Sequence, residues 1–130
     1  MPLESKLALG TVQFGLDYGI NNQRGRVPRE EAFAILECAA QNGVKLLDTA
    51  PSYGKSEEVL GKYLKTSNNR FDLVSKLPDC EPGQVEGELD GSLKRLNLNR
   101  LYGYLLNNFK TYREKPEVWS KLEGLKDSGK

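Results

Sequence analysis

The feature that most restricts the fold is a strict alternation of short apolar runs with amphipathic segments along the whole chain. Each apolar run has the length of a β-strand, and each amphipathic segment has apolar residues at helical spacing. Four such pairs predict a parallel α/β sheet whose strands are joined by right-handed helical crossovers. The runs are residues 6–14, 45–49, 71–77 and 101–106, and the segments are residues 28–42, 56–65, 84–96 and 114–126.

Two architectures fit this alternation: a small open sheet with helices on both faces, or an arc of a (β/α)8 barrel. Periodicity alone does not separate them. The length of 130 residues suffices for one domain with one core, so residues 1–130 are expected to form a single domain. A polar loop rich in glycine and asparagine, residues 17–27, joins the first run to the first helix.

Charge and hydropathy exclude several classes of function. The 19 basic and 18 acidic residues give a net charge of +1, which offers no support for binding to nucleic acid or to a membrane surface. No apolar run approaches the roughly 20 residues of a membrane-spanning helix. Residues 1–6 lack the apolar stretch of a secretion signal, so we expect a cytoplasmic protein.

The inventory of reactive side chains is short. Cys38 and Cys80 are expected to be free thiols in a reducing compartment, and they lack the spacing of metal ligands. The chain contains no histidine, so a mechanism that needs an imidazole is excluded within it. No metal site is predicted.

Polar side chains recur at one structural position. Asp48 ends the second predicted strand, Lys76 ends the third, and Asn107 follows the fourth. Barrel enzymes and open parallel sheets both place their functional groups at the carboxyl ends of the strands. Each residue alone could be an ordinary loop, capping or surface residue, but their recurrence at one edge predicts a site.

Four segments then resemble the aldo/keto reductase family in the correct order. Residues 43–61 (GVKLLDTAPSYGKSEEVLG) closely resemble its signature, in which a strand ends in Asp-Thr-Ala and is followed by Tyr-Gly, a Glu and a Leu-Gly. LGTVQFG is similar to the family's first strand and LVSKL to its lysine strand. SLKRLNLNRLYGYLLNN is similar to its third helix and fourth strand. The resemblance implies the N-terminal (β/α)4 half of a TIM-type (β/α)8 barrel, without the second half.

The resemblance also implies catalytic roles. Tyr53 matches the general acid that protonates a substrate carbonyl, and Lys76 matches the cation that favours its phenolate. Asp48 matches the carboxylate that holds the lysine in place. Asn107 stands where the family has a histidine that orients the carbonyl, and its amide retains two N–H donors but cannot titrate. A register in which Asn108 takes that place is the alternative.

The implied reaction is NADPH-dependent reduction of an aldehyde or ketone to an alcohol. Gly10, Thr11, Val12 and Asp48 match the family's contacts with the nicotinamide end of the cofactor. Most of the other cofactor contacts of the family belong to its second half. No GxGxxG follows a strand, so an independent dinucleotide site is not predicted.

A half barrel would leave two strand edges unpaired and its inner face open. We therefore expect a homo-oligomer, in which two copies can cover these surfaces. A small carbonyl compound is the expected partner if the chain is an enzyme. The alternative is an inactive half-barrel fragment or scaffold that self-associates, and a third reading is a small-molecule binding module without hydride chemistry.

Overall fold

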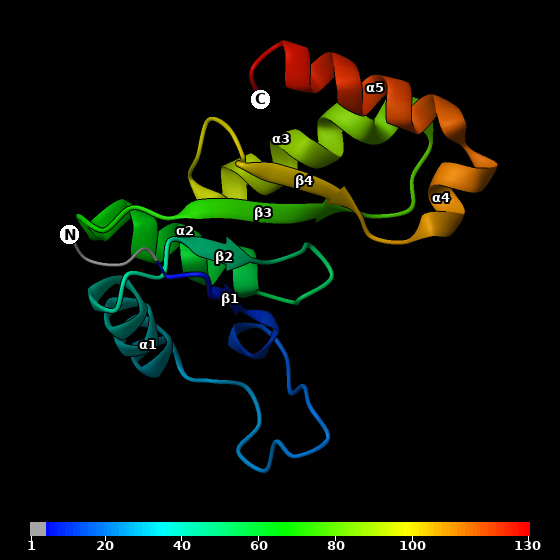
Figure 1. Ribbon diagram of the computed structural model, residues 1–130. Helices are drawn as coiled ribbons and strands as arrows, with labels where there is room; N and C mark the ends of the chain where they lie inside the picture. The colour runs from blue at the N-terminus through cyan, green and yellow to red at the C-terminus, as the bar shows by residue number, and fades with distance from the viewer. Residues whose placement is uncertain (1–4) are drawn as a thin grey trace.

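The computed structural model describes residues 5–130 as one sheet with helices packed along it (Figure 1). Residues 1–4, the start of the N-terminal stretch considered above for a secretion signal, lie outside the described residues. The strands are β1 (Ala8–Gly10), β2 (Leu46–Asp48), β3 (Asp72–Leu77) and β4 (Gly103–Leu106); the α-helices are α1 (Arg29–Gln41), α2 (Ser56–Thr66), α3 (Val85–Leu96), α4 (Phe109–Glu114) and α5 (Pro116–Asp127); and the short 3-10 helices are η1 (Val12–Phe14) and η2 (Pro82–Gln84).

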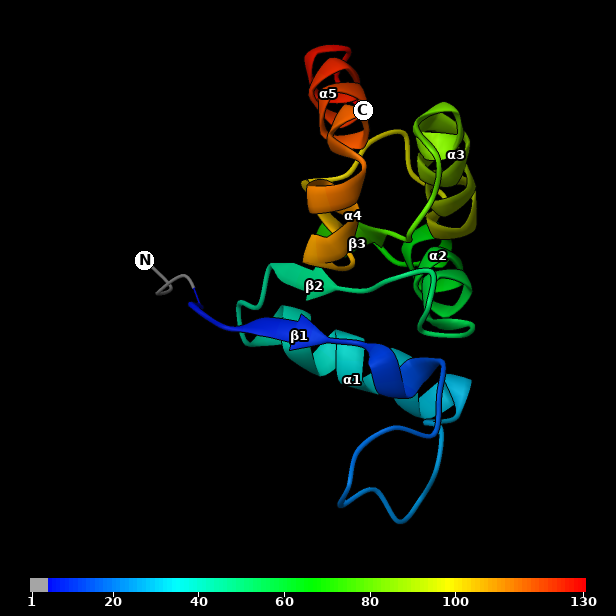
Figure 2. The same cartoon turned by 90° about the vertical axis from the view of Figure 1, so that its right-hand side faces the viewer.

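The sheet has the topology of a barrel arc. All four strands are parallel and lie in the order β1-β2-β3-β4. Figure 2 shows the helices in an arc from α1 through α2 and α3 to α5 around the outside of the strands. A doubly wound sheet would reverse its strand order and have helices on both faces. The prediction of a TIM-type half barrel is therefore confirmed, and the open-sheet alternative is excluded.

The pleat of the strands separates the core from the inner face. Leu47, Leu73 and Leu77 point toward the helices and are fully buried. Side chains alternate along a strand, so Asp48 and Lys76 point to the opposite, inner face. The buried core beneath α1 and α2 consists of Phe14, Ala32, Leu36, Leu47, Leu60, Tyr63, Leu73 and Leu96. A second cluster beneath α3 and α5 consists of Leu77, Cys80, Val85 and Val118.

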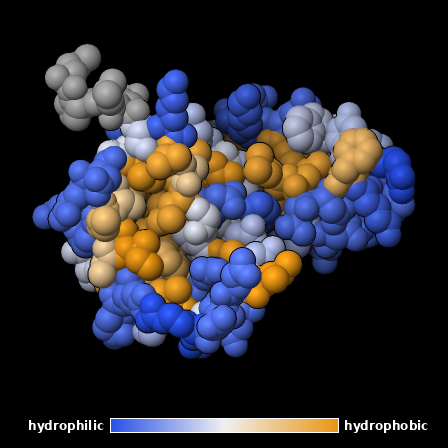
Figure 3. Space-filling model, turned by 60° about the horizontal axis from the view of Figure 1, so that its bottom comes forward, coloured by the Kyte–Doolittle hydropathy of each residue, from blue (hydrophilic) through white to orange (hydrophobic). Residues whose placement is uncertain are grey.

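Apolar side chains remain exposed near both edge strands. Leu7 precedes β1, Leu105 lies in β4, and Tyr102 immediately precedes β4. The view from below in Figure 3 shows apolar surface (orange) gathered in patches that polar side chains (blue) separate. Leu105 pairs in register with Lys76 and so lies on the inner face, which therefore exposes apolar surface.

The first strand is shorter than the predicted range of residues 6–14. Its partner β2 ends at Asp48, which pairs with Gly10, so the ladder stops there. The Thr11 amide donates to the Asp48 carbonyl oxygen at 3.1 Å, and the chain then turns into η1. Phe14 is buried by this turn rather than by a strand, which explains why an apolar run was mistaken for a longer strand.

The segment after β4 also differs from the prediction. The Asn108 side chain accepts a hydrogen bond from the Thr111 amide at 3.0 Å and caps α4, which was not predicted. Pro116 suits the first position of a helix and disfavours helical geometry in Lys115, whose φ is −133°. The predicted helix of residues 114–126 therefore begins at Pro116 and has the short α4 before it.

Both cysteines are free thiols, as predicted. Cys38 is exposed, whereas Cys80 lies in the second core cluster, where burial raises the pKa of its thiol. Within residues 5–130, no helix combines the length and the apolar character needed to cross a lipid bilayer.

Candidate active site

An ion pair on the inner face joins two of the predicted site residues. The Lys76 ammonium donates to both carboxylate oxygens of Asp48, each at 2.9 Å, and to the backbone carbonyl of Thr49 at 2.9 Å. The Lys76 side chain is 17% exposed and that of Asp48 is 35% exposed. Three hydrogen bonds satisfy all three donors of the ammonium, so its position is fixed at the carboxyl end of β2.

Tyr53 lies beside this ion pair. The Lys76 Nζ atom is 4.8 Å from the centroid of the Tyr53 ring, within range of a cation–π interaction. Tyr53 belongs to a tight loop, in which its amide donates to the Ala50 carbonyl and its own carbonyl accepts from the Ser56 amide, both at 3.1 Å. Asp48, Tyr53 and Lys76 are therefore brought together, while their catalytic roles stay predictions.

Glycines allow the Tyr53 loop to lie against the turn that follows η1. Gly54 adopts a positive φ of 57°, which disfavours any residue with a side chain. A Cβ atom on Gly15 would collide with the Tyr53 carbonyl oxygen, and one on Gly54 would collide with the Gly15 carbonyl oxygen, so the two backbones approach closely at these glycines. This close contact limits how far the Tyr53 loop can move from the carboxyl ends of β1 and β2.

Three buried hydroxyls connect both ends of the Tyr53 loop to the sheet. Thr11, Thr49 and Ser56 are fully buried. The Ser56 Oγ atom lies 2.8 Å from the Thr11 hydroxyl and 3.0 Å from the Thr49 hydroxyl. The Thr11 hydroxyl also donates to the Asp48 carbonyl at 2.8 Å. The ends of β1 and β2 and the start of α2 thus form one hydrogen-bonded unit.

The predicted cofactor contacts after β1 differ in whether they are accessible to a ligand. Gly10 is exposed, Val12 is partly exposed, and a Cβ atom on Gly10 would have no atom within 4 Å. Thr11 is fully buried, and its hydroxyl contacts Asp48 and Ser56 instead. A cofactor contact through the Thr11 side chain is therefore not available in this structure, whereas those of Gly10 and Val12 stay predictions.

Asn107 lies at the same end of the sheet but is not joined to the other three residues. Its backbone amide donates to the Leu77 carbonyl at 2.9 Å, which continues the ladder beyond β4. Its side chain is exposed and makes no hydrogen bond to any residue from 5 to 130. Asn108 is occupied as the cap of α4. The structure therefore favours Asn107 over Asn108 as the free amide at this strand end.

Sequence reasoning missed Glu57 as a functional candidate. Its carboxylate is almost completely buried beside the site and accepts from Ser75 and Arg95, each at 2.7 Å. A signal was present in the sequence: Glu57 stands three residues before Leu60 and four before Gly61, which places it on the inward face of α2. A charged residue at an inward helical position needs a specific partner.

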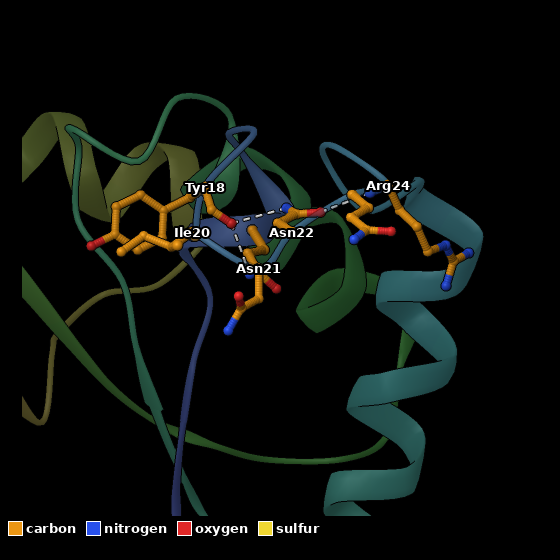
Figure 4. A pocket seen from close by; sticks show the side chains of 8 residues that line it. Tyr18, Ile20, Asn21, Asn22 and Arg24 are labelled. Atoms are coloured by element: carbon orange, nitrogen blue, oxygen red, sulfur yellow. Dashed lines mark hydrogen bonds between the residues drawn. The ribbon is translucent and has the colours of Figure 1, made fainter.

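The loop between η1 and α1 curls around a surface hollow that is separate from the ion pair (Figure 4). Its polar groups bind one another. Gln13 and Asn22 both donate to the Tyr18 carbonyl at 2.9 Å, and the Asn22 side chain accepts from the amides of Arg24 and Gly25. These bonds order the loop itself, and we assign no ligand to the hollow.

No cluster of three or more His, Cys, Asp or Glu side chains suited to a metal ion occurs in residues 5–130. The polar groups at the strand ends are instead one ion pair, one phenol and one amide. This combination suits proton transfer and carbonyl binding at the carboxyl end of a barrel arc.

A barrel arc with an ion pair, a phenol and an amide at the carboxyl ends of its strands has the arrangement of a barrel-enzyme site. The chain belongs to the aldo/keto reductase family, whose model matches residues 6–130. The relation covers the sheet, the ion pair and the Tyr53 loop described above.

Individual relatives agree with this family and are longer than the chain. The uncharacterized oxidoreductase YrpG of Bacillus subtilis is 28% identical, over 97% of this chain and 43% of its own length. The structure of an aldo-keto reductase from Pseudomonas aeruginosa is 34% identical, with a TM-score of 0.82 over 97% of this chain and 52% of its own. An aldo-keto reductase of Bombyx mori in complex with NADP is 22% identical, with a TM-score of 0.69 over 95% and 43%. The chain thus spans about half the length of these relatives.

Proposed function

We propose that this chain supplies the proton-donating half of an active site that reduces aldehydes or ketones to alcohols with NADPH. The observation that supports the proposal best is the Lys76 ammonium, which Asp48 holds 4.8 Å from the Tyr53 ring. A cation beside the ring can counter the negative charge that develops on the phenol oxygen as the proton is transferred in the reaction. The relation to oxidoreductases such as YrpG agrees with this chemistry.

Each residue of the chain has a defined part in the proposed reaction. The Tyr53 hydroxyl donates its proton to the carbonyl oxygen, the Lys76 cation stabilises the resulting phenolate, and the Asp48 carboxylate keeps the lysine oriented. The phenolate then recovers a proton from solvent. The Asn107 amide donates a hydrogen bond that orients the carbonyl.

We infer that the nicotinamide end of the cofactor would lie at the strand end beside Asp48. The space above Gly10 is open, since no atom lies within 4 Å of where a Cβ atom on Gly10 would be. Gly10, Val12 and Asp48 would hold the ring, and NADPH, when bound, supplies the hydride that joins the carbonyl carbon. The NADP complex of the Bombyx mori protein supports the choice of cofactor. The free thiols agree with a reducing compartment, and we place the reaction in the cytoplasm.

The proposal is tested in a chimeric barrel, in which residues 6–130 replace the matching half of the Pseudomonas aeruginosa protein. That relative has the best structural agreement of those described above. We expect aldehyde-dependent oxidation of NADPH, followed at the nicotinamide absorbance, with the intact relative as the positive control. A folded chimera that binds NADPH but oxidises none with any of a panel of aldehydes and ketones would refute the proposed reaction.

A second candidate function is an inactive half barrel that associates with itself. The open inner face and the exposed Leu7, Tyr102 and Leu105 near its edges favour it. A two-fold rotation would place β4 of one copy beside β1 of the other at both edges, with all eight strands parallel. This candidate predicts self-association without binding of NADPH, which nicotinamide fluorescence measures directly on the 130-residue chain.

A further inference from the structure

A buried carboxylate lies next to the proposed site and has no part in the proposed reaction. Glu57 is in the first turn of α2, and its side chain is 2% exposed. One carboxylate oxygen accepts from the Ser75 hydroxyl and the other from the Arg95 guanidinium, each at 2.7 Å. The link therefore connects α2 to β3 on one side and to α3 on the other.

Stability alone does not explain a charge at this position. Removing a carboxylate and its partner from water has a large desolvation cost, and apolar side chains of similar volume often stabilise such a site equally well. A carboxylate with two short, directional bonds instead fixes distances and angles more closely than apolar packing does. Glu57 thus favours one precise arrangement of three elements.

The arrangement that Glu57 fixes is the one that brings Lys76 to Tyr53. Ser75 and Lys76 are neighbours on β3 and point to opposite faces, so a bond to Ser75 from behind the sheet sets the position of the Lys76 backbone. Ser56, next to Glu57, bonds the Tyr53 carbonyl and the buried Thr49 hydroxyl. The same helical turn therefore positions both partners of the cation–π contact.

The approach of α3 makes this link possible. A Cβ atom on Gly61 would collide with the Arg95 carbonyl oxygen, so α2 and α3 touch backbone to backbone at this point. Gly61 follows Glu57 by one helical turn and lies on the same side of α2. This contact brings the Arg95 side chain within reach of the buried carboxylate.

We propose that Glu57 is a positioning residue that acts through Ser75 to hold the Lys76 ammonium against Asp48 and the Tyr53 ring. The inference rests on the proposed function for its importance to catalysis, but the ordering itself can be measured without cofactor or turnover. A residue that only stabilised the fold would leave the ordering of Lys76 unchanged in any variant that still folds.

The test observes the Lys76 ammonium directly in the 130-residue chain. Nitrogen-15 NMR detects a lysine ammonium when hydrogen bonds slow its exchange with water, and Lys76→Arg assigns the signal. We expect Glu57→Gln to speed this exchange about tenfold, as for the loss of one net hydrogen bond, while dispersed backbone amide signals show that the chain is folded. Glu58→Gln, a neighbouring exposed position on the same helix, should leave the exchange unchanged.

Ser75→Ala is the second variant, for use if Glu57→Gln does not fold. It removes the hydrogen bond between Ser75 and Glu57 without adding a buried donor, and it should speed the exchange of the Lys76 ammonium in the same way. Unchanged protection of Lys76 in either folded variant would overturn the inference, and so would a Lys76 ammonium that is unprotected in the original chain. If the ordering of Lys76 depends on Glu57 but the chimeric barrel reduces no carbonyl compound, only the proposed reaction is refuted. If the chimeric barrel is active but the ordering of Lys76 does not depend on Glu57, only the positioning role is refuted.

Discussion

At the residue scale, Asn107 is the clearest departure from the pattern of the family. Its side chain is exposed at the end of β4 and bonds no residue from 5 to 130, while Asn108 caps α4. An amide can donate to a carbonyl oxygen but has a shorter reach than an imidazole. We expect Asn107→His in the chimeric barrel to raise kcat about tenfold, the effect of one improved transition-state hydrogen bond.

The control is Asn108→Asp, which keeps an N-cap acceptor and should leave kcat unchanged. Steady-state kinetics of both variants are compared with the parent chimera. Unchanged or lower turnover in Asn107→His would argue against the orienting role of this position.

Glu37 gives the stability of the chain a dependence on pH. Its carboxylate accepts from the Tyr63 hydroxyl at 2.7 Å and from Asn69 at 3.0 Å, and the Tyr63 bond is the main reason that its pKa lies below the usual 4.5. A carboxyl with a lowered pKa in the folded state stabilises the fold above its unfolded pKa. That stabilisation is lost as the pH falls through the folded value.

The measurement is the free energy of unfolding by urea between pH 7 and pH 3. With Glu37→Gln, the free energy of unfolding should decline less steeply below about pH 4.5. With Glu58→Gln, it should decline as steeply as in the parent chain. A Glu37→Gln variant that loses stability on acidification as steeply as the parent would show that this carboxyl is not the group responsible.

The site residues differ in how far the sequence could predict them. Asp48, Tyr53 and Lys76 follow from one strand-end pattern and one family signature, and the structure brings all three together. Their contact distances depend on strand register and on the Tyr53 loop, which no local pattern encodes. Glu57 was missed because a charged residue in the first turn of a helix usually faces solvent, where it interacts with the helix dipole.

At the scale of elements, the four strand–helix units were predicted, but short turns were not. The η1 and α4 elements have six residues or fewer, below the length at which apolar periodicity is informative. Each depends instead on a tertiary hydrogen bond or a cap, such as Thr11 to Asp48 or Asn108 to Thr111. Periodicity therefore identified the long elements that pack on the core and missed the short elements that redirect the chain, including η1, which adds Phe14 to the core.

The contact between α2 and α3 tests helix packing directly. Gly61→Ala would place a Cβ onto the Arg95 carbonyl, force the helices apart, and lower the free energy of unfolding by about 1–3 kcal/mol. Gly87→Ala in α3 is the matched control, because its Cβ would meet no atom within 4 Å and should raise stability by roughly 0.5–1 kcal/mol. Equal effects of the two substitutions in urea unfolding would contradict the close backbone contact.

At the scale of the whole molecule, the open inner face predicts association of the isolated chain. Edge strands β1 and β4 and the exposed Leu7 and Leu105 have no partner within residues 5–130 that covers them. Light scattering should therefore give a mass of at least about twice the 14.6 kDa of one chain. Leu105→Lys should shift the population toward the monomer, and a monodisperse monomer of the parent chain would contradict this prediction.

The central claim is that Tyr53 delivers the proton in carbonyl reduction, and the most direct measurement is kcat of the chimeric barrel with Tyr53→Phe. The variant keeps the ring beside Lys76 and removes only the hydroxyl. We predict that kcat falls about 10²–10⁴-fold while NADPH binding, measured by nicotinamide fluorescence, stays the same. A Tyr53→Phe variant that keeps the kcat of the parent would contradict the account.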